Sequence, residues 1–198
     1  GEMTHSYFAY NSTIWVPLIV CAPGLKSART AGYVGHEDIF PSVCDLLGLD
    51  QPAGLTGRSF RPLLEGRTRK ARPIYFEALE GYYHRGAAPL RGVIDGPMKY
   101  MDSPIPELYD LGADFDEAVN LASKRDLAPY KKTLDGIVKS VSVRPGTGAV
   151  RQTDRETLER LRSLGYASGP AAPAKKTFGA ADDLKTLLPF GQKLVQAG

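Results

Sequence analysis

Apolar residues at the start of this chain form one short, continuous run. The run from Ile14 to Val20 is long enough for a buried strand and too short to span a membrane. It is followed by the turn signal Ala22-Pro23-Gly24 and preceded by a polar loop that contains His5. We therefore predict a buried strand with a functional loop in front of it.

The next pattern has the spacing of an amphipathic helix. Apolar residues recur on one face between Glu37 and Leu47, and Gly48 follows as a C-cap; they are Ile39, Phe40, Val43, Leu46 and Leu47. A loop over residues 54–60 and a short apolar segment over 60–64 come after this predicted helix.

The middle of the chain has the pattern of short strands. Segments 73–77, 90–94, 98–101 and 107–111 are rich in apolar and aromatic residues, and Asp95-Gly96 is a strong hairpin signal. Four short strands with tight turns predict a small antiparallel sheet.

Helical patterns return after the sheet. Residues 116–121 predict a short helix. A longer predicted helix starts near Asp126, and its apolar stripe is expected to cover one face of the sheet. The stripe consists of Leu127, Tyr130, Leu134, Ile137, Val138 and Val141. Residues 153–156 form a capping box that opens a third helix.

The end of the chain changes in composition. Residues 167–179 are rich in Ala, Pro, Gly and Lys, which is typical of a linker. A last amphipathic pattern follows, interrupted by Pro189, and nothing in the sequence offers an apolar surface for it. We therefore expect it to begin a further domain.

Composition excludes some functions. The chain has 198 residues and a net charge of +3, too small an excess to indicate a nucleic-acid partner. The basic stretch Arg67 to Arg72 is interpreted as a solvated loop. Cys21 and Cys44 lie on apolar stretches and are expected to be core residues rather than a disulfide pair.

Few residues offer obvious chemistry. The histidines are His5, His36 and His84, and no two have the spacing of metal ligands. His36-Glu37-Asp38 is compatible with a metal cluster, but an acidic helix N-terminus explains the two carboxylates more simply. The sequence contains no phosphate-binding glycine loop and no nucleophile elbow.

Several motifs nevertheless resemble the sulfatase family of the alkaline-phosphatase superfamily. Gly1 to Phe8, Val16 to Val20 and Ala22-Pro23-Gly24 match its pattern, and further segments follow in the family's order: residues 38–41, 46–49, 55–59, 62–66, 75–77, 99–100, 107–111, Glu117 and Asn120-Leu121. The segment 161–166, the linker and the last helix resemble bacterial relatives that continue into tetratricopeptide repeats.

The resemblance implies an α/β fold that is the C-terminal part of an alkaline-phosphatase-like sandwich. Its divisions would be 1–66 as the end of the catalytic core, 67–148 as an antiparallel-sheet subdomain with a helix, 149–166 as a tail helix, 167–181 as a linker, and 182–198 as the start of a helical repeat. The N-terminal half of the catalytic domain would then be a further part of the same protein.

The implied reaction is metal-dependent hydrolysis of a sulfate ester on a glycan or a small molecule. The cofactor would be a divalent cation, Ca²⁺ first and Mg²⁺ or Mn²⁺ as alternatives, held mostly by residues outside this chain. Cys21 has the Cys and Pro of the family's nucleophile motif, but Leu25 replaces its Arg and its place in the order is wrong, so we reject it. The chain alone is therefore expected to be inactive.

Two sets of candidate site residues remain. His5 falls where the family places a group that contacts the ester oxygen or protonates the leaving group, a role that suits the near-neutral pKa of His. A backbone-bonded loop histidine is the structural alternative. His84 and Arg85 fall in a loop that relatives direct toward substrate; an exposed loop without ligand contact is the alternative.

Two rival functions stay open at this point. The same superfamily includes phosphodiesterases, phosphonate hydrolases and phosphoryl transferases, and fold does not fix function. A non-catalytic scaffold, with the C-terminal helical repeats docking a protein partner, is the rival from another class. The resemblance also points to a bacterial periplasmic or membrane-associated protein, although the sequence itself fixes no compartment.

Overall fold

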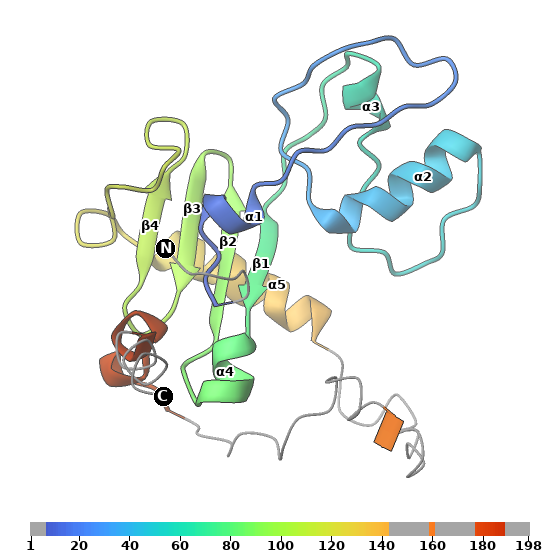
Figure 1. Ribbon diagram of the computed structural model, residues 1–198. Coiled ribbons are helices and arrows are strands. Elements are labelled where there is room, and N and C mark those ends of the chain that lie inside the picture. Colours follow the sequence, from blue (N-terminus) through green and yellow to red (C-terminus); the bar gives the residue numbers. More distant parts are fainter. Residues whose placement is uncertain (1–6, 143–158, 161–176, 189–198) are drawn as a thin grey trace.

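A four-stranded antiparallel sheet lies at the centre of the structure. The computed structural model describes residues 7–142, 159–160 and 177–188. The strands are β1 (Ile74–Ala78), β2 (Leu90–Asp95), β3 (Met98–Asp102) and β4 (Glu107–Asp110), arranged in the order β1-β2-β3-β4 (Figure 1). The predicted mixed α/β fold with a small antiparallel sheet is confirmed.

The β2–β3 hairpin has the expected turn. Asp95 pairs with Met98 across a two-residue loop. Gly96, at the first loop position, has a φ of 56°, which glycine adopts without steric cost.

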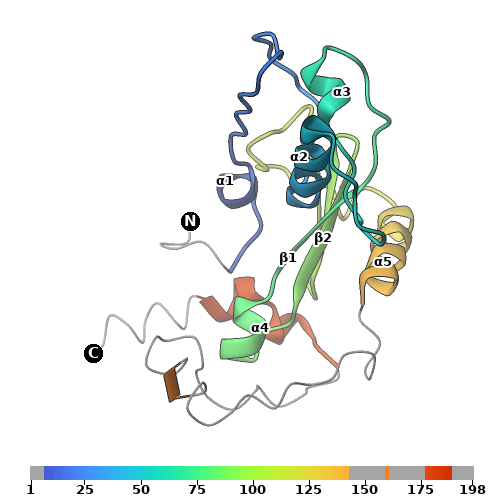
Figure 2. The ribbon, with the colours of Figure 1, turned by 90° about the vertical axis from the view of Figure 1, so that its right-hand side faces the viewer.

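Each face of the sheet is covered by a different part of the chain. Helix α5 (Ala128–Val141) places Leu134 against Val93, Tyr100 and Leu108, as its apolar stripe predicted. The other face packs against the N-terminal segment; its buried cluster is Ala9, Leu90, Ile94, Met101, Tyr109 and Leu111. Figure 2 shows α1 and α5 on opposite sides of the sheet.

The apolar run 14–20 does not form the predicted buried strand. Helix α1 (Asn11–Ile14) takes the beginning of the run, and the chain continues as an extended segment outside the sheet. Val16 is 55% exposed and Ile19 90% exposed. The prediction was wrong for this structure because the run has no ladder partner among the described residues, and Pro17 has no N–H to offer one.

The predicted helix after residue 37 is confirmed. The 3-10 turn η1 (His36–Asp38) leads into α2 (Ile39–Leu47), and Gly48 ends it with a φ of 67°. This helix buries Pro41, Ser42 and Cys44, whereas its apolar face is exposed: Ile39, Phe40, Val43 and Leu47. The short helix α3 (Arg61–Leu64) follows the buried Phe60.

Other expectations need correction. Cys44 is buried as predicted, but Cys21 is exposed because the segment that carries it lies outside the sheet. Residues 116–121 form irregular backbone, with a turn at Asp116 and a bend at Val119, instead of a helix, and Glu117 has a left-handed φ of 56° that a helix excludes. Of the predicted third helix, Glu159 and Arg160 are helical and the rest lies outside the described residues.

The last described segment packs against the sheet subdomain. It contains η2 (Ala180–Asp182) and helical residues 184–188. Leu184 is 5% exposed and Asp183 1% exposed, so the expectation that this segment had no surface to bury against was wrong. Within the described residues, no helix is both long and apolar enough to cross a bilayer.

Candidate functional site

The residues Tyr82 to Gly86, predicted as a loop, form most of a short helix. Helix α4 (Glu80–Arg85) connects β1 to β2, and Gly86 ends it with a φ of 65°. His84 and Arg85 therefore lie in its last turn, on a short helix close to the end of β1 (Figure 1).

Arg85 contacts the N-terminal segment. Its Nε donates a hydrogen bond to the Tyr7 hydroxyl at 2.9 Å, and its guanidinium carbon lies 5.2 Å from the centre of the Tyr7 ring. The structure thus brings α4 beside a residue two positions after His5. His5 itself lies outside the described residues.

His84 faces solvent. Its Nε2 lies 3.7 Å from Oε2 of Glu80, one turn earlier in α4, and both side chains are 44% exposed. Such an exposed pair contributes little to stability. The imidazole is therefore accessible to a ligand.

A buried ion pair anchors the N-terminal segment to the sheet. Lys99 and Glu117 have side chains 0% and 3% exposed, and Lys99 Nζ lies 2.6 Å from Glu117 Oε1. Asn11 joins both partners: its Oδ1 accepts from Lys99 at 3.1 Å, and its backbone N–H donates to Glu117 at 2.5 Å. Burial lowers the pKa of Lys99, and the Glu117 carboxylate opposes that effect.

A second anchor lies one residue earlier in the chain. The Tyr10 hydroxyl donates to Oε1 of Glu107 at 3.0 Å. Burial and the neighbouring Glu107 carboxylate raise the pKa of Tyr10, so it remains a hydroxyl donor at neutral pH. Together the two anchors fix the chain that follows His5.

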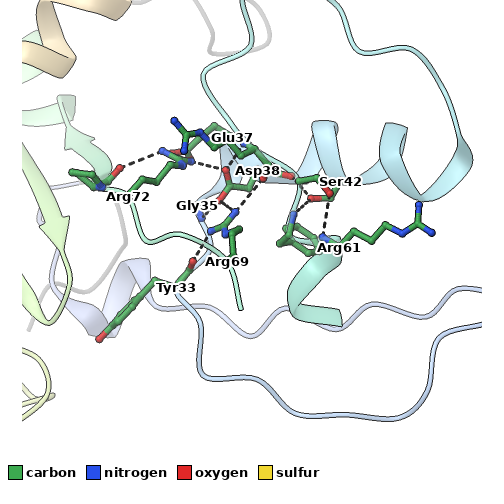
Figure 3. A network of polar contacts seen from close by, with 12 residues as sticks. Tyr33, Gly35, Glu37, Asp38, Ser42, Arg61, Arg69 and Arg72 are labelled. Carbon is green, nitrogen blue, oxygen red and sulfur yellow. Dashed lines mark hydrogen bonds and ion pairs between the residues drawn. The ribbon is translucent and has the colours of Figure 1, made fainter. Parts of the chain in front are cut away.

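Asp38 is the centre of a separate polar network (Figure 3). This fully buried carboxylate pairs with Arg69 at 2.9 Å and Arg72 at 2.5 Å, and accepts from the backbone N–H groups of Gly35 and Arg58. The prediction that residues 67–72 are simply solvated was therefore wrong for these two arginines, whose side chains are 12% and 16% exposed.

The environment of Asp38 explains its ionisation. Burial alone would raise its pKa, but the hydrogen bonds from Arg58, Arg72, Arg69 and Gly35 outweigh burial and hold the pKa below the ordinary value of an aspartate. A pocket of about 150 Å³ lies beside Arg69 and Arg72. The charges of both arginines are balanced by Asp38 and Glu37, so the network joins loops rather than forming an anion site.

The described residues do not fit a metal ion on their own. Within residues 7–142, 159–160 and 177–188, no three His, Cys, Asp or Glu side chains gather closely enough to hold one.

The sequence pattern missed the contacts that organise this region. In the sequence, Tyr7 is only one aromatic residue among several, and Lys99 is only one residue of a predicted strand. The residues Asp38, Arg69 and Arg72 are charges that lie far apart along the chain. A lysine inside an otherwise apolar strand is the one signal that could have indicated a buried ion pair.

Known proteins with similar sequences are sulfatases. Residues 3–143 match the family model described as N-sulphoglucosamine sulphohydrolase, C-terminal. Delta 4,5-hexuronate-2-O-sulfatase of Bacteroides thetaiotaomicron is 30% identical over 144 residues, which cover 65% of this chain and 29% of the relative. Arylsulfatase K of Mus musculus is 29% identical over 174 residues, which cover 79% of this chain and 31% of the relative. The chain thus spans about 30% of the length of these relatives.

A solved structure shares the fold. Phosphonate monoester hydrolase from Silicibacter pomeroyi superposes with a TM-score of 0.52 and 20% identity, covering 68% of this chain and 30% of the other. At this identity the similarity concerns architecture alone.

Proposed function

Because this chain belongs to the N-sulphoglucosamine sulphohydrolase C-terminal family, we propose that it is the C-terminal part of an enzyme that hydrolyses sulfate esters. The family match over residues 3–143 is the observation that carries the proposal. Relatives named as sulfatases that are about three times longer than the matched region support it.

The proposed substrate is a sulfate ester of a glycan or a small molecule. One relative is named for a hexuronate 2-O-sulfate and another as an arylsulfatase, which is why both classes are included. His84 and Arg85 are proposed to contact the sulfate or a neighbouring polar group, since a guanidinium offers paired donors to such oxygens. Arg85 would do so while its Nε remains bound to Tyr7.

His5 is proposed as the general acid of the reaction. An imidazolium can protonate the leaving alkoxide, and its ordinary pKa suits that task near neutral pH. The anchors at Tyr10 and Asn11 support this proposal, because they restrain the chain a few residues beyond His5.

A divalent cation is proposed as the cofactor, with Ca²⁺ first and Mg²⁺ or Mn²⁺ as alternatives. When bound, such an ion draws charge from the ester oxygens. Its ligands would come from polypeptide other than the described residues. The same additional polypeptide is proposed to cover the exposed apolar side chains of α2 and of residues 15–19.

A protein partner that docks on helical repeats beyond residue 182, in a bacterial protein, remains a prediction. The likeness to a phosphonate monoester hydrolase concerns the fold and does not favour phosphorus chemistry.

The function is tested by assaying the complete protein that contains this chain. Purified enzyme is supplied with aryl sulfates and sulfated disaccharides, and in parallel with phosphate diesters and phosphonate monoesters, with and without each cation. Preferential release of sulfate supports the proposal. Faster hydrolysis of the phosphate diesters or the phosphonate monoesters, measured as release of their alcohol, or no turnover of any ester with any cation, would overturn it.

A further inference from the structure

The tail segment, residues 177–188, lies against the same end of the sheet subdomain as α4. Both views show it beside α4, below the strands (Figures 1 and 2). It is far from α4 in sequence, yet it makes backbone, apolar and ionic contacts there. These contacts come in two groups.

The first group joins the tail segment to α4. Leu184 is 5% exposed, and a Cβ on Gly81 would lie 2.5 Å from its Cδ1, so the Leu184 side chain packs directly onto the backbone of α4 at this glycine. The carbonyl oxygen of Asp182 accepts from the backbone N–H of Ala88 at 2.8 Å. The rings of Phe178 and Tyr82 meet edge to face, with centres 6.1 Å apart.

The second group joins the tail segment to the β3–β4 turn. Asp183 is 1% exposed, and its Oδ2 accepts from the Ser103 hydroxyl at 2.7 Å and from the Ile105 N–H at 2.9 Å. Lys185 Nζ donates to the Ile105 carbonyl at 2.9 Å and lies 3.6 Å from Glu107 Oε2. The tail segment is therefore held by two separate parts of the sheet subdomain, the α4 region and the β3–β4 turn.

Helix α4 needs such support. It has six residues, whereas helices shorter than about 12–15 residues are marginal in water without tertiary contacts. Its packing comes from Leu184 on one side and from Tyr7 on the other. Without the tail segment, the helix that carries His84 and Arg85 would lose its apolar contact at Gly81.

We propose that the tail segment is a clamp that fixes α4, and that Leu184 and Asp183 are positioning residues for substrate binding by His84 and Arg85. This inference rests on the proposed function. Leu184 orders α4 directly, and Asp183 holds Leu184 in place through the β3–β4 turn. Neither side chain is required to touch the substrate.

The test uses the complete protein with Leu184→Ala and Asp183→Ala, and Leu134→Ala as the matched control. Leu134 is also a buried leucine, 1% exposed, but it belongs to α5 and packs against Val93, Tyr100 and Leu108 of the sheet. It therefore reports the effect of lost stability without a contact to α4. Two quantities are measured: hydrogen exchange of the amides of residues 79–88, and kcat and KM for the best sulfate ester found.

The clamp variants should increase amide exchange in residues 79–88 and raise KM about tenfold, the loss expected for one hydrogen bond to a charged group. Their kcat should change little, and Leu134→Ala should alter neither KM nor exchange in that segment. Unchanged exchange in both clamp variants would overturn the clamp. Increased exchange with unchanged KM would overturn the positioning role. Exchange needs no turnover, so failure of the proposed function is seen separately, as absence of sulfatase activity in the unsubstituted protein.

Discussion

Gly57 lies so close to the carbonyl oxygen of Glu37 that a Cβ at position 57 would overlap it. The neighbouring Arg58 N–H donates to Asp38 at 2.8 Å, so the loop 54–60 is pressed onto the start of α2. Both segments are among those that resemble sulfatases. The packing of Gly57 and Arg58 against the start of α2 accounts for the sulfatase-like pattern of these two segments.

Gly57→Ala should lower the free energy of unfolding by about 1–3 kcal/mol, because backbone must move to accommodate the methyl group. The same substitution at Gly136, within α5, meets no atom within 4 Å and should stabilise the helix by about 0.5–1 kcal/mol. Denaturant titration of both variants checks the contrast. Equal effects of the two substitutions would contradict this interpretation.

Asp38 should make stability sensitive to acid. Its pKa is lowered in the folded protein by its hydrogen bonds, so the carboxylate favours folding above the ordinary pKa of an aspartate, and that contribution is lost as pH falls through the lower, folded pKa. The melting temperature of the unsubstituted protein should therefore fall as the pH is lowered below about 4. Asp38→Asn should be less stable at neutral pH and show a weaker acid dependence. Asp50 is exposed, so the Asp50→Asn variant serves as control and should keep the same dependence of melting temperature on pH as the unsubstituted protein.

Lys99 and Glu117 should be strongly coupled. Lys99→Met leaves Glu117 buried without its partner and should cost about 3–5 kcal/mol of unfolding free energy. Adding Glu117→Gln removes that uncompensated charge and retains an acceptor for the Asn11 N–H. A double-mutant cycle should therefore give a double variant more stable than the sum of the single losses predicts. Additive losses would show that the two residues act independently.

His5→Ala should lower kcat of the complete enzyme by about 10²–10⁴-fold if His5 is the general acid. The exposed His36→Ala is the matched control and should leave kcat unchanged. Substrates with a better leaving group should be less affected, since they need less protonation. An unchanged rate for His5→Ala removes it from the mechanism.

The chain on its own should associate or bind hydrophobic dyes through its exposed apolar side chains. Phe40 is 53% exposed and Leu47 68% exposed on one face of α2. Phe40→Ser and Leu47→Ser should reduce dye binding and sedimentation of aggregates. Val141→Ser, which replaces an exposed residue on α5, should not. A sharp, reversible melt of the unsubstituted chain, without dye binding, would contradict the expectation.

The sequence predicted local structure well wherever local pattern decides it. The four strands, the Asp95-Gly96 turn, α2 and α5 follow from alternation, turn residues and helical spacing. The run 14–20 was misjudged because a strand depends on a partner that no local pattern supplies. Residues 116–121 were misjudged because the ion pair with Lys99 holds Glu117 in a left-handed conformation.

The candidate site was only partly predictable for the same reason. His84 and Arg85 were identified from family resemblance, but their helix and the contact with Tyr7 are tertiary facts. The docking of Leu184 could not be read from its own segment, because the surface that receives it is a glycine in α4.

The sequential order of the strands also bears on how the chain folds. Each strand of the sheet pairs with its neighbour in sequence, and α5 is the next element along the chain after β4, so the contacts within residues 74–141 join elements that are neighbours in sequence. Low contact order of this kind favours rapid folding. The meander and α5 can therefore form early as a nucleus. The N-terminal segment and the tail segment, which contact it across long sequence separations, would then add to a preformed template.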